Sequence, residues 1–121
     1  MPIVDVEIVL RPDEVVRKEI ATELANDLGE IFQSPPAGTW VKVRELSAEC
    51  YAENGGTPNG VYPIFVSITK SKLPEVDELE REAAKITGAV AQICGRSSEN
   101  VHLIYQPEGR GRVAFGGKMV L

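Results

Sequence analysis

The chain has no long apolar run and few residues of the kinds that build metal centres or disulfide frameworks. No stretch of about 18 apolar residues occurs, so no segment is expected to span a membrane. Cys50 and Cys94 are too few and too far apart for a disulfide framework, and no His or Cys partners stand at zinc spacing. We therefore expect two reduced thiols, no metal site and no cofactor.

Positive charge is also scarce. Lys and Arg number 13 against 18 Asp and Glu, giving a formal charge of −5 and a pI near 4.9. This balance argues against nucleic acid and anionic lipid surfaces as partners, because both attract basic proteins. The first residues lack a basic segment followed by an apolar one, so a signal peptide is not expected and the predicted location is cytoplasmic. At 121 residues, the chain is expected to form a single domain, 1–121.

Pro2 stands at the head of a segment with the pattern of a β-strand. In residues 3–10 apolar side chains alternate with acidic ones, which is typical of a strand with two unlike faces. Proline cannot donate to a sheet ladder and is only tolerated at a strand's first position. Two interpretations stay open. Pro2 is either a residue of no consequence after the start signal, or a secondary amine fixed at the end of a strand once Met1 is removed.

Two amphipathic helices are predicted. The first is expected from Pro12 to Ile31, because proline suits a first helical position and apolar residues then recur every three or four residues. The prolines of SPPAG end it. The second is expected from Pro74 to Cys94, with an acidic first turn and Gly95 just past its end.

Three further strands complete the predicted sheet, at residues 39–46, 61–70 and 100–106. The segment 61–70 is almost continuously apolar, so it is expected to be central and buried on both faces. The glycine-punctuated segment 108–121 is expected to form a short strand or to pack on a neighbouring subunit.

The order of elements divides the chain into two similar halves, 1–46 and 61–107, each reading β-α-β. Strands joined through a helix pair in parallel through right-handed crossovers. The predicted fold class is therefore α+β, with a four-stranded mixed sheet and both helices on one face. The other face would carry apolar side chains that a monomer would expose, so a symmetric oligomer is expected. The side chains assigned to that face are Ile3, Trp40, Ile64 and Val66.

Four stretches, taken in their order and spacing, resemble the tautomerase superfamily, which includes 4-oxalocrotonate tautomerase, macrophage migration inhibitory factor and malonate semialdehyde decarboxylase. They are PIVDVEIVLRPDE, ELSAECYAENGG, SITKSK and VHLIYQPEGRGRVAFGG, and the likeness covers essentially the whole chain. The resemblance implies a homotrimer with active sites at subunit boundaries and the amine of Pro2 as catalytic base after removal of Met1. The implied reaction is enol–keto tautomerisation of a small 2-oxo acid or a dienol.

The resemblance also implies the rest of the site. An apolar pocket with cationic neighbours disfavours the protonated amine and would lower the pKa of Pro2 toward the working range. Cations are needed for the substrate carboxylate, first Lys70 and Lys72 and then Arg11. The expected apolar walls are Tyr51, Ile68 and Phe115.

Each assignment has a structural alternative, and the function has alternatives too. Lys70 and Lys72 could be solvated, Arg11 could cap the strand end, and His102 is expected to be a structural histidine. The resemblance departs where Trp40 and Ser34 replace cations and where SPPAGTW lacks an acid, which disfavours hydration chemistry. The competing functions are a catalytically silent trimeric binding protein of the same fold, and a decarboxylase or hydratase acting on a small oxo acid.

Overall fold

The computed structural model describes residues 2–121. Met1, whose removal the predicted mechanism requires, lies outside the described residues. The strands are β1 (Ile3–Val9), β2 (Trp40–Leu46), β3 (Ile64–Thr69), β4 (Val101–Tyr105), β5 (Ala114–Phe115) and β6 (Lys118–Met119). The helices are α1 (Ile20–Ile31) and α2 (Val76–Cys94), with single-turn helices at Ala48–Cys50 and Ser98–Asn100.

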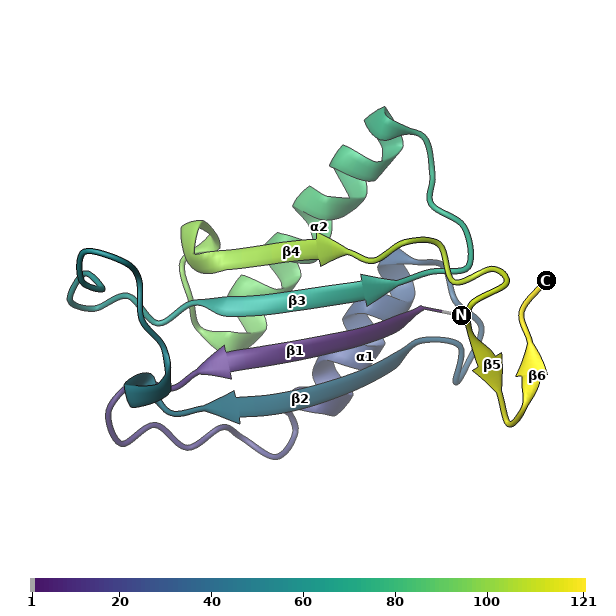
Figure 1. Ribbon diagram of the computed structural model, residues 1–121. Helices are drawn as coiled ribbons and strands as arrows, with labels where there is room; N and C mark the ends of the chain where they lie inside the picture. The colour runs from purple at the N-terminus through teal and green to yellow at the C-terminus, as the bar shows by residue number, and fades with distance from the viewer. Residues whose placement is uncertain (1) are drawn as a thin grey trace.

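The first four strands form one mixed sheet in the order β2-β1-β3-β4. β1 pairs in parallel with β2, and β3 pairs in parallel with β4, so each β-α-β half has the predicted parallel ladder. The halves join where β1 and β3 run antiparallel. Both helices lie on the same face of this sheet (Figure 1). The predicted α+β architecture is confirmed.

The core lies between the sheet and the two helices. Alternate residues of β1 and β3 point into it, as the period-2 pattern requires, and α1 and α2 supply their apolar stripes. The fully buried members include Val4, Val6, Ile64, Val66, Ile68, Leu24, Leu28, Ile86 and Val90.

The predicted start of the first helix is wrong. α1 begins at Ile20, eight residues after Pro12. Asp13 adopts φ 60°, in the left-handed region that an α-helix of L-residues cannot contain, and the Glu14 amide closes a turn onto the Arg11 carbonyl. The second helix agrees closely with its predicted bounds, and Gly95 ends it in a left-handed conformation, φ 67°.

The sheet face away from the helices, here called the open face, differs from its prediction. Ile64 and Val66 were expected there but lie in the core, because in β3 the side chains of Phe65, Ser67 and Thr69 point the other way. For the same reason β3 is central but is covered on one face only within this chain. The open face therefore combines apolar and charged groups.

Its apolar members are half-exposed, Trp40 at 52% and Ile104 at 55%. Its charged members form cross-strand pairs between β1 and β2, with Lys42 Nζ 3.1 Å from Asp5 and Arg44 Nε 4.0 Å from Glu7.

Neither helix of residues 2–121 has the length and apolar content needed to cross a membrane. Within the same residues, no group of three or more His, Cys, Asp or Glu side chains is arranged to hold a metal ion.

Candidate functional site

Pro2 is buried at the start of β1 and opens on a small cavity. The Trp40 amide donates to the Pro2 carbonyl at 3.0 Å, so the β1–β2 ladder continues one residue beyond the strand. The cavity has a volume of about 140 Å³ and is lined by Pro2, Ala37, Gly38, Trp40 and Phe115. None of these side chains is charged. A base placed here would face an apolar environment, which disfavours its protonated form.

The loop after α1 forms one wall of this cavity through a tight turn. The Gly38 amide donates to the Pro35 carbonyl at 2.9 Å, and a Cβ on Gly38 would come within 2.9 Å of that same oxygen. Only glycine fits this approach without a backbone shift. Ala37 adopts φ 64°, a conformation that costs an L-residue roughly 1–2 kcal/mol. The Ala37 carbonyl accepts a hydrogen bond from the Trp40 indole at 2.9 Å, which fixes the ring over the cavity.

The C-terminal segment forms the other wall. It folds into the β5–β6 hairpin, and Phe115 meets Trp40 edge to face, with ring centroids 5.1 Å apart and an interplanar angle of 81°. The hairpin lies beside the N-terminal end of β1 (Figure 1). Backbone bonds attach the preceding residues to the end of β3, with the Gln106 amide donating to Ile68 and the Gly109 amide to Lys70. Part of the tail is thus strand, as predicted.

Lys70 follows β3 and points toward α2. Its Nζ donates to Glu82 at 2.7 Å and lies 5.0 Å from the centroid of the Phe32 ring. The second oxygen of Glu82 accepts from the Tyr105 hydroxyl at 2.8 Å. Burial, and then the bond to Glu82, raises the pKa of Tyr105. These groups border a second cavity, of about 350 Å³, whose lining includes Phe32, Lys70 and Glu82 but not Pro2.

The structure brings together two of the predicted site residues, Pro2 and Phe115. Ile68 pairs with Val4 across the β1–β3 ladder and is fully buried beneath the helices. Lys72 is exposed in the bend after β3. Lys70 is engaged by Glu82 and is absent from the lining of the Pro2 cavity.

Arg11 and Tyr51 lie at the opposite end of the sheet from Pro2. Arg11 is nine residues along an extended chain from Pro2, or roughly 30 Å at about 3.3 Å per residue. Its guanidinium donates to the Gly95 carbonyl. Tyr51 follows β2 and donates its hydroxyl to Glu53 at 2.5 Å, while its ring packs on Phe65 at 5.9 Å. Neither residue approaches Pro2 of its own chain.

His102 lies on the open face in β4. Its ring packs against Phe65 with centroids 5.6 Å apart, and Phe65 in turn packs on Tyr51. The three rings form a continuous aromatic row on the open face, far from the Pro2 end.

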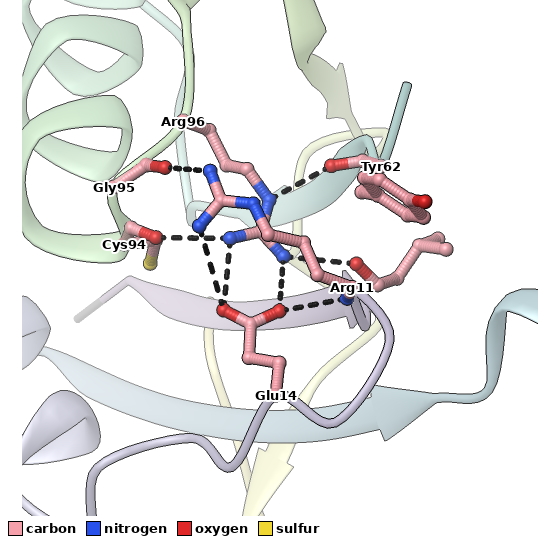
Figure 2. Close-up of polar contacts among 7 residues, drawn as sticks. Arg11, Glu14, Tyr62, Cys94, Gly95 and Arg96 are labelled. Atoms are coloured by element: carbon pink, nitrogen blue, oxygen red, sulfur yellow. Dashed lines mark hydrogen bonds and ion pairs between the residues drawn. The ribbon is translucent and has the colours of Figure 1, made fainter. Parts of the chain in front are cut away.

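The buried Arg96, which the sequence analysis did not single out, joins three parts of the chain at that far end. Its guanidinium donates to both Glu14 oxygens, at 2.7 and 3.0 Å, and to the carbonyls of Val9 and Tyr62 (Figure 2). The hydrogen bond from Arg96 holds the pKa of Glu14 below its usual range. Nothing local marks Arg96 in the sequence, because its partners outside the end of α2, namely Tyr62, Glu14 and Val9, lie 34 to 87 residues away. Its role here is structural.

Comparison with known proteins identifies the fold. No protein-family model matches the sequence, and no curated protein matches it. A fused 4-OT, a wild-type symmetric trimer, superposes with a TM-score of 0.78 at 13% identity, over 98% of this chain and 94% of its own. The macrophage migration inhibitory factor of Trichinella spiralis gives 0.71 at 14% identity, over 97% and 98%. FG41 malonate semialdehyde decarboxylase inhibited by 3-bromopropiolate gives 0.68 at 16%, over 94% and 90%. The chain thus has the fold of these three solved structures, as the sequence resemblance predicted.

Proposed function

We propose that this chain, once Met1 is removed, is a tautomerase that uses the amine of Pro2 as a general base on the enol of a 2-oxo acid or on a dienol. The observation that carries the proposal is the Pro2 cavity. Pro2 is buried at the rigid end of β1 and faces about 140 Å³ of space bounded by uncharged side chains. A base that is fixed in position and kept from protonation is what proton transfer to carbon requires.

The proposed reaction moves one proton and consumes nothing. The Pro2 nitrogen takes the proton from the enol hydroxyl, the electrons shift along the conjugated system, and the resulting ammonium returns the proton to carbon. The proline ring restricts the direction of the nitrogen lone pair, and the bond from the Trp40 amide to the Pro2 carbonyl fixes the residue in the ladder. Trp40 and Phe115 would shield the transfer from water.

The substrate carboxylate requires a cation near the Pro2 end of the sheet. Lys72 is exposed there, and Lys70 has donors beyond the one given to Glu82. Ile68 would lie beneath this site in the core.

Arg11 and Tyr51 would serve only a neighbouring subunit's site. We propose a homotrimer on two grounds, namely the half-exposed Trp40 and Ile104 on the open face and the trimeric state of the fused 4-OT.

A decarboxylase is the second candidate, because malonate semialdehyde decarboxylase shares the fold. The loop over Pro2, residues 34–40, carries no acid to assist such chemistry. Tautomerisation needs the base and a cation for the carboxylate but no acid from this loop, so it remains the primary proposal. A catalytically silent protein of this fold would retain Met1, which leaves the Pro2 nitrogen as an amide without basicity.

The experiment compares two preparations of the same chain, with intact masses measured first. One has a free Pro2 amine, and the matched control carries one extra glycine before Pro2, so that its nitrogen is an amide. Both are assayed on enols of 2-oxo acids, on a dienol and on malonate semialdehyde. The proposal predicts enol turnover only with the free amine. Equal turnover by both preparations, or turnover of malonate semialdehyde alone, would overturn it.

A further inference from the structure

The end of β3 places Lys70 across the sheet from Pro2. The last pair of the antiparallel β1–β3 ladder is Ile3 with Thr69, and the same register next pairs Pro2 with Lys70. Backbone hydrogen bonds to the neighbouring segments support the addition of this pair to the ladder. The Pro2 carbonyl accepts from the Trp40 amide, and the Lys70 carbonyl accepts from the Gly109 amide at 2.7 Å. Directly opposed residues of such a ladder have Cα atoms about 4.5–5.5 Å apart.

Both side chains belong to the helix-covered face. Strand side chains alternate, so Pro2 shares the face of Val4, and Lys70 shares that of Ile68; both of those neighbours are fully buried. The Lys70 side chain therefore starts beside the Pro2 ring and runs beneath the helices.

The Lys70 ammonium is held rather than solvated. The side chains of Lys70 and Glu82 are only 18% and 12% exposed, and their ion pair is 2.7 Å long. Glu82 is fixed in turn by the Tyr105 hydroxyl at 2.8 Å, and the Phe32 ring lies against the ammonium. A charge pair this enclosed is screened much less by salt and water than a surface pair.

Other ionisable groups surround the pair from every packed element. α2 contributes Glu78, Arg81 and Lys85 to the shared cavity, whereas the end of α1 and the residues after it contribute uncharged side chains, those of Ile31, Phe32 and Gln33. Beyond β3 and β4 lie Lys72, which is exposed, and Glu108, whose carboxylate accepts from the Leu73 amide. Of these, Glu82 is the group bonded to Lys70.

We infer that Glu82 is a positioning residue, which holds the Lys70 ammonium on the helix-covered face that Pro2 shares and so sets how readily the Pro2 amine takes a proton. The role given to the amine rests on the proposed function. The electrostatics do not, since a fixed positive charge disfavours a neighbouring ammonium whether or not the protein is an enzyme. Glu82 opposes this effect in part, and Tyr105 keeps the carboxylate in place.

The test is an NMR titration of the ¹⁵N-labelled Pro2 amine in full-length protein with a free N-terminus. Lys70→Met removes the positive charge and should raise the amine pKa, whereas Glu82→Gln removes the opposing charge and should lower it. Each shift is expected to be about one unit, the low end of the one to three units by which a close charge moves a pKa, because Lys70 is opposed to Pro2 in the ladder but its ammonium points toward α2. Glu78→Gln removes a carboxylate of the same cavity that is not bonded to Lys70, so it is the matched control and should leave the amine pKa within a few tenths of wild type.

Thermal unfolding of each variant separates these effects from loss of fold. If Lys70→Met does not fold, Glu82→Gln still tests the inference, because the glutamine amide can form hydrogen bonds with both Lys70 and Tyr105. A lowered amine pKa in Glu82→Gln supports the inference, and an unchanged or raised one overturns it. Enol turnover is measured separately. If the amine pKa shifts in opposite directions in Lys70→Met and Glu82→Gln but the wild-type protein turns over no enol, the proposed function is refuted and this inference stands.

Discussion

Replacing Arg96 with methionine should destabilise the fold more than any exposed substitution. The side chain is 2% exposed and fixes the ends of β1 and α2 to the segment before β3. Its loss leaves the Glu14 carboxylate with only the more distant Arg11, at 4.0 Å, and removes the donor to three carbonyls, those of Val9, Tyr62 and Cys94. Methionine preserves much of the apolar stem, so the change reports mainly on the polar contacts.

The expected cost follows from the burial of the pair. Breaking a buried ion pair by removing one partner costs about 3–5 kcal/mol. Glu14 is 20% exposed and can regain some hydration, which places the expected loss near the lower end, about 3 kcal/mol. For a domain of this size that corresponds to a melting temperature lower by roughly 10 °C.

Urea unfolding at pH 7 measures the loss, and two variants control it. Arg17→Met removes the Arg17–Glu23 ion pair, whose side chains are 53% and 44% exposed, so it should cost far less stability than Arg96→Met. Glu14→Gln completes a double-mutant cycle with Arg96→Met, and the two losses should be less than additive because they remove the same contact. An Arg96→Met loss no larger than that of Arg17→Met would refute the reasoning.

Three further predictions follow from individual groups. The pKa of Glu14 is lowered in the folded protein, so the stability that its ionised carboxylate contributes should be complete above the ordinary pKa of 4.5 and lost as the pH falls through the lowered pKa. Urea unfolding midpoints should drop over that pH range, and they should drop less in Glu14→Gln. Burial raises the pKa of Cys94 to about 11, whereas Cys50 is exposed. A thiol reagent at pH 8 should therefore modify Cys50 rapidly in native protein, and Cys50→Ser should abolish this rapid phase. Equal rates of modification for the two cysteines would contradict the burial of Cys94. Phe115→Ala should open the Pro2 cavity and reduce kcat/KM for enols about tenfold, the scale of one aromatic contact, while Met119→Ala on the same hairpin should leave it unchanged.

Local patterns were enough to predict the sheet and the second helix. The alternation in residues 3–9 reflects one covered face, and the acidic start and Gly95 end of α2 are signals that act within one turn. The start of α1 could not be predicted this way. Its apolar stripe extends back to Val16, but the segment is held outside the helix by the turn at Asp13 and by the distant partner of Glu14. Tertiary contacts override helix propensity there.

The candidate site was predictable only in part. The place of Pro2 at the head of β1 drew attention to it, but its proposed role as the base came from the resemblance to the tautomerase superfamily. Phe115 was proposed as a wall from the resemblance of the C-terminal segment. The partners of Lys70 could not be predicted, because Glu82 and Tyr105 come from α2 and β4 and meet only in the folded chain. Lys70 is therefore engaged within the chain, whereas Lys72 is exposed.

The most direct test of the proposed mechanism is the rate of enol tautomerisation by Pro2→Ala compared with wild type, both with free N-termini confirmed by mass. Alanine leaves a primary amine that is more flexible, so the base is retained without its fixed direction. Turnover should fall by roughly 10²-fold or more, the usual contribution of a positioned general base. Undiminished turnover of Pro2→Ala on every enol that wild type accepts would contradict the assignment of Pro2 as the base.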